Sequence, residues 1–334
     1  MESVIVLTAA EPSLLDAIYN WGLTLIRGIQ TIESPGLTEV IQFITSLGTE
    51  LFYIPAVLVI FWCVDEKKGM RLAMLILLSA WINGTFKALL KQPRPYNLDP
   101  SVGRAFEPSY GIPSGHAQGS LVFWAPVAAW LSRKTGKAPA NVTERSEGLQ
   151  AVAVWAVSVL IILLIGFTRL YLGVHFPTDL LAGWLLGGII LTLYFLFESP
   201  LAAFFRAGGR RTMMIAAAAV AFLMNIIYPD DISLGGLFLG LGAGYALMLG
   251  SFPFSAGAPI KGRKPGPAVM ALRLLIGFAG AALLYLGLKN LFPGETSVYY
   301  RLGRFIRYGL LSFWAAAGAP WVFLRLGLAG KREA

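Results

Sequence analysis

Pro113-Ser114-Gly115-His116 opens the apolar run 115–132 (GHAQGSLVFWAPVAAWLS), and the rest of the chain is organised around this stretch. It contains one of the two histidines among 334 residues. The other, His175, lies in the stretch 168–179 (TRLYLGVHFPTD), at the start of another apolar run. A third polar stretch, 87–95 (KALLKQPRP), closes the apolar run just upstream. Histidines and cations at the ends of hydrophobic segments indicate a phosphate site at a membrane surface.

The composition is that of an integral membrane protein. Hydrophobic residues make up 56% of the chain and charged residues only 13%, whereas charged residues make up about 25% of a soluble domain. A membrane-spanning helix needs about 20 predominantly apolar residues. The sequence therefore predicts an all-α polytopic transmembrane helix bundle of about nine spans, near residues 45–64, 69–90, 115–132, 149–172, 178–198, 212–229, 232–252, 267–290 and 303–327.

The N-terminal part is predicted to lie along the membrane surface. Residues 13–32 place apolar side chains at helical spacing but include Asp16, Asn20 and Arg27, a pattern typical of an interfacial helix. We expect this interfacial segment to occupy residues 1–35, followed by a core over 36–200 that contains the three polar stretches and by a C-terminal transmembrane extension over 201–334.

The extension carries no recognisable motif, so three interpretations stay open for it: a lipid-facing addition, a dimer surface and a substrate-selecting lid. Within it, Gly236, Gly240 and Gly244 recur at four-residue spacing. Small residues at this spacing favour close helix packing, and a gate is the less economical interpretation.

Basic residues alternate between successive connections. They follow the first, third, fifth and seventh runs and end the chain, as Lys67, Lys68 and Arg71; Arg133, Lys134, Lys137 and Arg145; Arg206, Arg210 and Arg211; Lys261, Arg263 and Lys264; and Arg325, Lys331 and Arg332. Short loops rich in Lys and Arg stay on the cytoplasmic side. We therefore expect the polar stretches to face the periplasm or exterior of a bacterium, with the inner membrane as the location, or the lumen of an endomembrane. Arg301 and Arg304 break the alternation.

The same loops explain the net charge of +9, and we expect no nucleic-acid partner. Cys63 is the single cysteine, which excludes an intramolecular disulfide and a cysteine-built metal site. Near the polar stretches the sequence has no cluster of His, Cys and carboxylates with metal-ligand spacing, so we expect no metal and no other cofactor.

The first two polar stretches supply candidate anion ligands. Pro93 and Pro95 end the helix and hold Arg94 on an extended segment, although Lys87 and Arg94 could also be lipid-snorkelling side chains. Ser114 and Gly115 begin a helix whose free N–H groups would attract an anion. An ordinary helix cap is the alternative. His116 in the first turn favours a functional interpretation, since the positive end of the helix dipole disfavours an imidazolium unless an anion is bound.

The third stretch carries a histidine and an aspartate four residues apart. If the helix begins near Pro177, His175 and Asp179 share a face. The carboxylate can then accept the imidazole Nδ1–H and leave Nε2 as a nucleophile. Isolated pairs of this spacing are often structural, but an aspartate near a bilayer is costly and usually functional. Arg169 lies a short loop away.

Together these stretches resemble the three signature motifs of the type 2 phosphatidic acid phosphatase (PAP2) family. Lys87, Arg94 and Pro95 match the first motif, residues 113–116 the second, and Arg169, His175 and Asp179 the third, in which Thr168 replaces the family's serine. The resemblance implies that His175 forms a phosphohistidine, that Asp179 orients it and that His116 protonates the leaving oxygen. It also implies that Lys87, Arg94, Ser114, Gly115 and Arg169 hold the phosphoryl oxygens without a metal.

The expected function is that of an integral membrane phosphatase acting on a lipid phosphate monoester or diphosphate, with the substrate and membrane lipids as its partners. The span count argues against the family's soluble vanadium haloperoxidases. The topology resembles that of glucose-6-phosphatase, so a sugar-phosphate substrate stays open. A phosphotransferase using the same intermediate also stays open, as does a non-catalytic lipid-binding or transport protein. The sequence does not predict the oligomeric state.

Overall fold

The computed structural model describes residues 13–133 and 144–331 and is built almost wholly of helices. The α-helices are α1 (Leu14–Gln30), α2 (Pro35–Ser46), α3 (Glu50–Val59), α4 (Glu66–Leu90), α5 (Pro95–Leu98), α6 (Gly115–Leu131), α7 (Glu144–Tyr171), α8 (Pro177–Ile227), α9 (Ser233–Ser251), α10 (Pro267–Leu291), α11 (Tyr300–Phe313) and α12 (Ala319–Arg325). Within the described ranges, four short π or 3₁₀ helices lie between them: η1 (Ile60–Val64), η2 (Pro100–Val102), η3 (Pro229–Asp231) and η4 (Trp314–Gly318). The strands β1 (Phe254–Ser255) and β2 (Gly330–Lys331) form one antiparallel pair.

The predicted helical membrane bundle is confirmed, and its span count is not. By length and composition, five helices of the described ranges can cross a membrane, or six if the bent pair of α2 with α3–η1 is one span. The helix α6 is 17 residues long and α11 is separated from α12 by a π turn, so neither is among them. The predicted spans 178–198 and 212–229 lie in the single helix α8, which is interrupted where Gly209 adopts φ 62°. Glycine reaches this region without a steric penalty.

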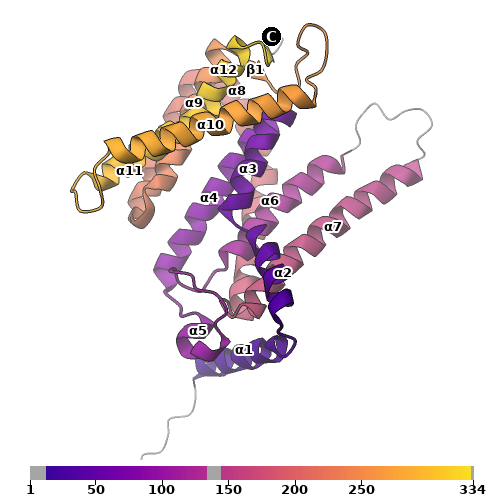
Figure 1. Ribbon diagram of the computed structural model, residues 1–334, viewed down its shortest axis with the longest axis vertical. Coiled ribbons are helices and arrows are strands. Elements are labelled where there is room, and N and C mark those ends of the chain that lie inside the picture. Colours follow the sequence, from indigo (N-terminus) through magenta and orange to yellow (C-terminus); the bar gives the residue numbers. More distant parts are fainter. Residues whose placement is uncertain (1–12, 134–143, 332–334) are drawn as a thin grey trace, which may run out of the picture.

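The bundle has two unlike ends (Figure 1). The helices α1 and α5 lie at one end, and β1, α10 and α12 lie at the other, with α4 running between them. Each of the three polar stretches ends or begins a helix at the α1 end. Lys134, Lys137 and Arg332, which are predicted to lie on the cytoplasmic side of the membrane, fall outside the described residues.

A buried polar network joins α4 to α6. The amide of Asn83 donates to the Gln118 side-chain carbonyl at 2.8 Å, and Gln118 in turn donates to the backbone carbonyl and hydroxyl of Ser79, both at 2.8 Å. Asn83 also donates to the Pro113 carbonyl at 3.3 Å. Side chains that bond across membrane helices hold them in register, so this network fixes the start of α6 relative to α4.

The helices of the extension pack closely through the predicted glycine positions. A Cβ added at Gly236 or Gly240 would collide with backbone carbonyls of α11, and one at Gly244 would lie 3.0 Å from the Cβ of Ala316. The packing interpretation of this spacing is therefore confirmed. Arg301 and Arg304, at the start of α11, contact the turn that joins α8 to α9: Arg301 donates to the Pro229 carbonyl, and Arg304 pairs with Asp231 at 3.2 Å.

A buried arginine ties the extension to the rest of the chain. Arg273 of α10 donates to the carbonyls of Trp62 and Ala256, both at 2.8 Å, and of Leu328 at 2.9 Å. These three carbonyls belong to η1, to the segment after β1 and to the segment before β2. A single guanidinium therefore satisfies backbone groups from three separate parts of the chain.

Replacing Arg273 with methionine should lower the stability of the extension. The change leaves three buried carbonyls without donors, at a cost of about 1–3 kcal/mol for each unpaired group. We expect a clear fall in the thermal unfolding midpoint of purified Arg273→Met in detergent. The midpoint of Arg273→Lys should lie between those of Arg273→Met and the unchanged protein. The exposed Arg211 offers a control, Arg211→Met, that should unfold like the unchanged protein. Equal midpoints for Arg273→Met and the control would contradict this role.

Candidate active site

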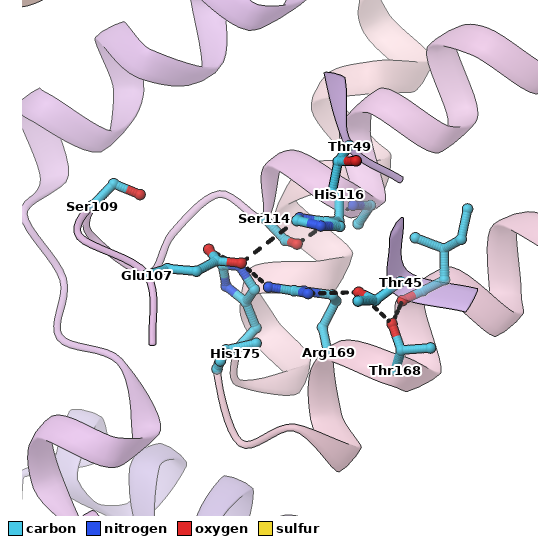
Figure 2. A network of polar contacts seen from close by, with 12 residues as sticks. Thr45, Thr49, Glu107, Ser109, Ser114, His116, Thr168, Arg169 and His175 are labelled. Carbon is cyan, nitrogen blue, oxygen red and sulfur yellow. Dashed lines mark hydrogen bonds and ion pairs between the residues drawn. The ribbon is translucent and has the colours of Figure 1, made fainter. Parts of the chain in front are cut away.

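The fold brings the three polar stretches together at the α1 end of the bundle. Arg94 precedes α5, Ser114 caps α6, and Arg169 lies in the last turn of α7. His175 lies in the loop before α8 and Asp179 in the first turn of that helix. Figure 2 shows the side chains of His116, Arg169 and His175 lying around one acidic residue, Glu107.

His175 and Asp179 form the pair that their spacing predicts. The Nδ1 of His175 lies 3.1 Å from Asp179 Oδ2, and the same oxygen accepts the Phe176 N–H at 2.9 Å. Pro177 begins α8 and so sets the direction of its first turn. Both side chains of the pair are buried. The aspartate is therefore held by two donors and can orient the imidazole.

The hydrogen bonds of His175 define which ring nitrogen carries the proton. Arg94 Nη1 lies 3.2 Å from His175 Nε2, and an arginine can only donate. Since a carboxylate only accepts, Nδ1 bears the hydrogen and Nε2 the lone pair. Burial, together with the charges of Arg94 and Arg169, holds the pKa of His175 well below its usual value. The imidazole is neutral, as a nucleophile must be.

Arg94 is fixed by its surroundings on every side. Its Nε donates to the Ser109 carbonyl at 2.6 Å, Nη1 to the Val174 carbonyl at 2.8 Å, and Nη2 to the Ser109 hydroxyl at 3.0 Å. Nη2 also pairs with Glu107 Oε2 at 2.8 Å. The guanidinium is buried, so it presents a preorganised charge to the centre of the site.

Arg169 approaches the same centre from α7. Its Nη1 donates to the Thr45 hydroxyl at 2.6 Å and its Nη2 pairs with Glu107 Oε1. Its buried Nε has no hydrogen-bond partner among the described residues. The Thr168 hydroxyl donates to the Ile165 carbonyl at 2.6 Å, and it lies 3.0 Å from the Thr45 hydroxyl. Thr168 therefore supports the residue that anchors Arg169 and does not reach Glu107 itself.

The second polar stretch supplies a helix start and a histidine. The Ser114 hydroxyl accepts the Ala117 N–H at 3.4 Å, and the Ser114 N–H donates to the Asp179 carbonyl at 2.9 Å. The serine therefore acts as a helix cap and also links α6 to α8. Gly115 lies against Asn83, whose Oδ1 would be 3.2 Å from an added Cβ. His116 Nδ1 lies 3.9 Å from Glu107 Oε1.

Lys87 lies differently from the other predicted phosphate ligands. Its ammonium group donates to the carbonyls of Tyr110 and, at 3.2 Å, of Gly111. These contacts hold the loop that leads into α6. The lysine adds positive charge near the centre, but its hydrogen bonds in this structure go to the loop.

Glu107 is the residue at the centre that sequence reasoning missed. Its two carboxylate oxygens pair with Arg94 and Arg169 and lie 3.9 Å from His116 Nδ1 and from His175 Nε2. An acid in the connection that also carries Arg94 and Arg104 was the available signal, although Asp99 lies in the same connection. Thr45 and Ser109, which anchor the two arginines, gave no signal because their spacing to the motifs is arbitrary.

The donor set at this centre does not resemble a metal site. In residues 13–133 and 144–331, no group of three or more His, Cys, Asp or Glu side chains could hold a metal ion. The centre is lined by guanidinium groups, which suit an anion and repel a cation. The expectation of a metal-independent reaction stays a prediction.

Comparison with known proteins identifies the family. Residues 68–201 match the PAP2 superfamily, and residues 232–331 match the transmembrane extension of PAP2 superfamily phosphatases. The chain belongs to the PAP2 superfamily and is a multi-pass membrane phosphatase.

Three curated relatives match about half of this chain. Phosphatidylglycerophosphatase B of Bacillus subtilis is 28% identical over 187 residues, covering 55% of this chain and 84% of the relative. Undecaprenyl-diphosphatase of Sulfolobus acidocaldarius is 29% identical over 188 residues, covering 54% and 80%. Glucose-6-phosphatase catalytic subunit 1 of Haplochromis nubilus is 25% identical over 193 residues, covering 53% of each chain.

Proposed function

We propose that the protein hydrolyses a lipid phosphate monoester or diphosphate through a phosphohistidine on His175. One observation carries this proposal: His175 Nε2 and His116 Nδ1 each lie 3.9 Å from the same carboxylate, which is itself held by two buried arginines. A phosphoryl group at that position has a nucleophile, a proton donor and two cations around it. Positioning and charge stabilisation are what phosphoryl transfer requires.

The residues divide the reaction into two steps. In the first, His175 Nε2 bonds to phosphorus, the bond from phosphorus to the leaving oxygen breaks, and His116 gives that oxygen its proton. In the second, water attacks the phosphohistidine, His116 takes the water's proton, and inorganic phosphate leaves. Asp179 holds Nδ1–H throughout and stabilises the positive charge on the ring. Arg94, Arg169 and the N–H groups at Gly115 and His116 hold the phosphoryl oxygens, with the nearby charge of Lys87 in support.

Apolar side chains beside the centre support a lipid substrate. Phe106, adjacent to Glu107, is 78% exposed, and Tyr110 in the same connection is 44% exposed. An exposed aromatic pair at the headgroup level can contact an acyl or prenyl chain whose phosphate enters the site. Two relatives are named for lipid substrates, a phosphatidylglycerophosphatase and an undecaprenyl-diphosphatase, and this agrees with the proposal.

Three competing functions could use the same site. A phosphotransferase would pass the phosphoryl group from His175 to a second lipid in place of water. A sugar-phosphate phosphatase is suggested by the glucose-6-phosphatase relative. A non-catalytic lipid-binding protein would have no use for the His175–Asp179 pair, whose geometry serves a nucleophile.

We further propose nine crossings, with α8 counted as two spans divided at Gly209 and with α6 and α11–α12 each counted as one. The proposed parts are the interfacial segment 1–35, the catalytic core 36–200 and the extension 201–334, although residues 1–12 lie outside the described ranges. In α1, the exposed Leu14 and Trp21 and the buried Leu23 and Ile26 support a helix lying in the interface. The site would face the periplasm or exterior from a bacterial inner membrane.

Replacing His175 with alanine should abolish phosphate release without unfolding the protein, because the residue supplies the covalent step. His116→Ala should reduce turnover by about 10²–10⁴, the usual contribution of a general acid, and least for a substrate with a good leaving group. Labelled substrate quenched in alkali, where the P–N bond survives, should label the unchanged protein and not His175→Ala. Phosphate release by His175→Ala at the original rate would eliminate this mechanism.

Activity should persist in EDTA and be inhibited by orthovanadate.

Lipid phosphates should have a far higher kcat/KM than glucose 6-phosphate. Phe106→Ala should lower kcat/KM for the lipid phosphate by roughly tenfold, since the ring can no longer be covered by the lipid chain. The value for glucose 6-phosphate should stay unchanged. Phe222→Ala, an exposed position on α8, is the matched control. A preference for glucose 6-phosphate in the unchanged protein would favour the sugar-phosphate phosphatase.

The proposed orientation can be measured by cysteine labelling. In a Cys63→Ala background, Val298→Cys, between α10 and α11, should react with an impermeant thiol reagent in intact cells. Lys264→Cys, between α9 and α10, should react only after permeabilisation. The reverse pattern would mean that the substrate is drawn from the cytoplasmic leaflet.

A further inference from the structure

We propose that the Glu107 carboxylate is an internal competitor for the phosphate position. It excludes headgroups of lower charge from the site until a phosphate monoester or diphosphate displaces it. The inference deepens the proposed function and rests on it. Glu107 lies outside the three polar stretches, in the connection between η2 and α6. Its role follows from what its carboxylate contacts.

The carboxylate uses the donors that a phosphate would need. Glu107 Oε2 lies 2.8 Å from Arg94 Nη2, and Oε1 pairs with Arg169 Nη2. The same two oxygens lie 3.9 Å from His175 Nε2 and from His116 Nδ1. A phosphoryl group bonded to the same N–H groups would lie within a few ångströms of a negative carboxylate, so the two anions cannot share the centre.

The side chain can leave the centre while its backbone stays in place. The Tyr96 hydroxyl donates to the Glu107 carbonyl at 2.8 Å and accepts the Glu107 N–H at 3.3 Å. The Glu107 side chain is 25% exposed, whereas those of Arg94 and Arg169 are 1% and 3% exposed. Rotation about the side-chain bonds therefore carries the carboxylate toward solvent, and the two arginines remain where they are.

Charge decides which ligand displaces it. A phosphate monoester carries close to two negative charges at neutral pH, and a carboxylate carries one. The phosphodiester headgroups that make up most of a bilayer also carry one charge and present fewer free oxygens. A site at headgroup level meets such diesters continuously. An internal carboxylate on the arginine pair would reject them and still yield to a monoester.

The test compares Glu107→Gln and Glu107→Asp with the unchanged protein. Inorganic phosphate binding is measured by calorimetry in a His175→Ala background, and KM, kcat and inhibition by orthovanadate and by phosphatidylglycerol are measured with His175 present. The control is Glu33→Gln, because Glu33 also pairs with an arginine, Arg104, at 2.7 Å. That pair does not touch Arg94 or Arg169.

Glu107→Gln should bind phosphate and orthovanadate roughly 10- to 100-fold more tightly, the range expected when a charge-assisted competitor is removed. KM should fall more than kcat changes, and phosphatidylglycerol, a diester, should become a competitive inhibitor. Glu107→Asp, with a shorter reach, should lie in between, and Glu33→Gln should match the unchanged protein.

Unchanged or weaker phosphate binding by Glu107→Gln, in protein whose thermal midpoint is retained, would overturn the proposal. A fall in kcat with unchanged KM and phosphate affinity would also overturn it, since Glu107 would then act in the chemistry. If Glu107→Gln binds phosphate more tightly while the unchanged protein hydrolyses no lipid phosphate, the competitor role stands and the proposed function fails.

Discussion

Two buried guanidinium groups that face one carboxylate impose the main physical constraint on this protein. Arg94 and Arg169 are each almost fully shielded from solvent, and a buried charge is tolerated only when it is paired and hydrogen-bonded. Their partners come from separate parts of the chain: Thr45 from α2, and Ser109 and Glu107 from the connection before α6. The connection and the helix ends are held in place because they satisfy these two charges.

The helix α1 packs around that arrangement and supports it. In the sequence, α1 precedes the matched PAP2 segments, which begin at residue 68. Gln30 donates to the carbonyls of Val102 and Tyr171, both at 2.8 Å, and so links the connections that lead to His116 and His175. Arg27 pairs with Asp99 at 2.6 Å. The Ser101 hydroxyl and Arg27 hold the pKa of Asp99 at about 2, so this pair stays charged at any physiological pH.

The opposite end of the bundle is held together by different interactions. There the helices α9 and α11 approach closely through glycines, and one arginine, Arg273, satisfies carbonyls from three segments. Close backbone approach and hydrogen bonds between helices both let membrane helices associate without a hydrophobic driving force. The extension is therefore anchored at the end away from the phosphate centre.

The helical membrane fold, the three polar stretches and the His175–Asp179 pair could be predicted from the sequence, because apolar run length and four-residue spacing are local properties of a helix. The sequence placed Arg94 and Arg169 near a phosphate site but could not say what pairs with them. The three-dimensional arrangement was needed to show that Glu107 lies between them and that Lys87 binds the loop. The positions of Glu107 and Thr45 depend on contacts with distant residues such as Tyr96 and Thr168, and no periodicity in the chain encodes such contacts.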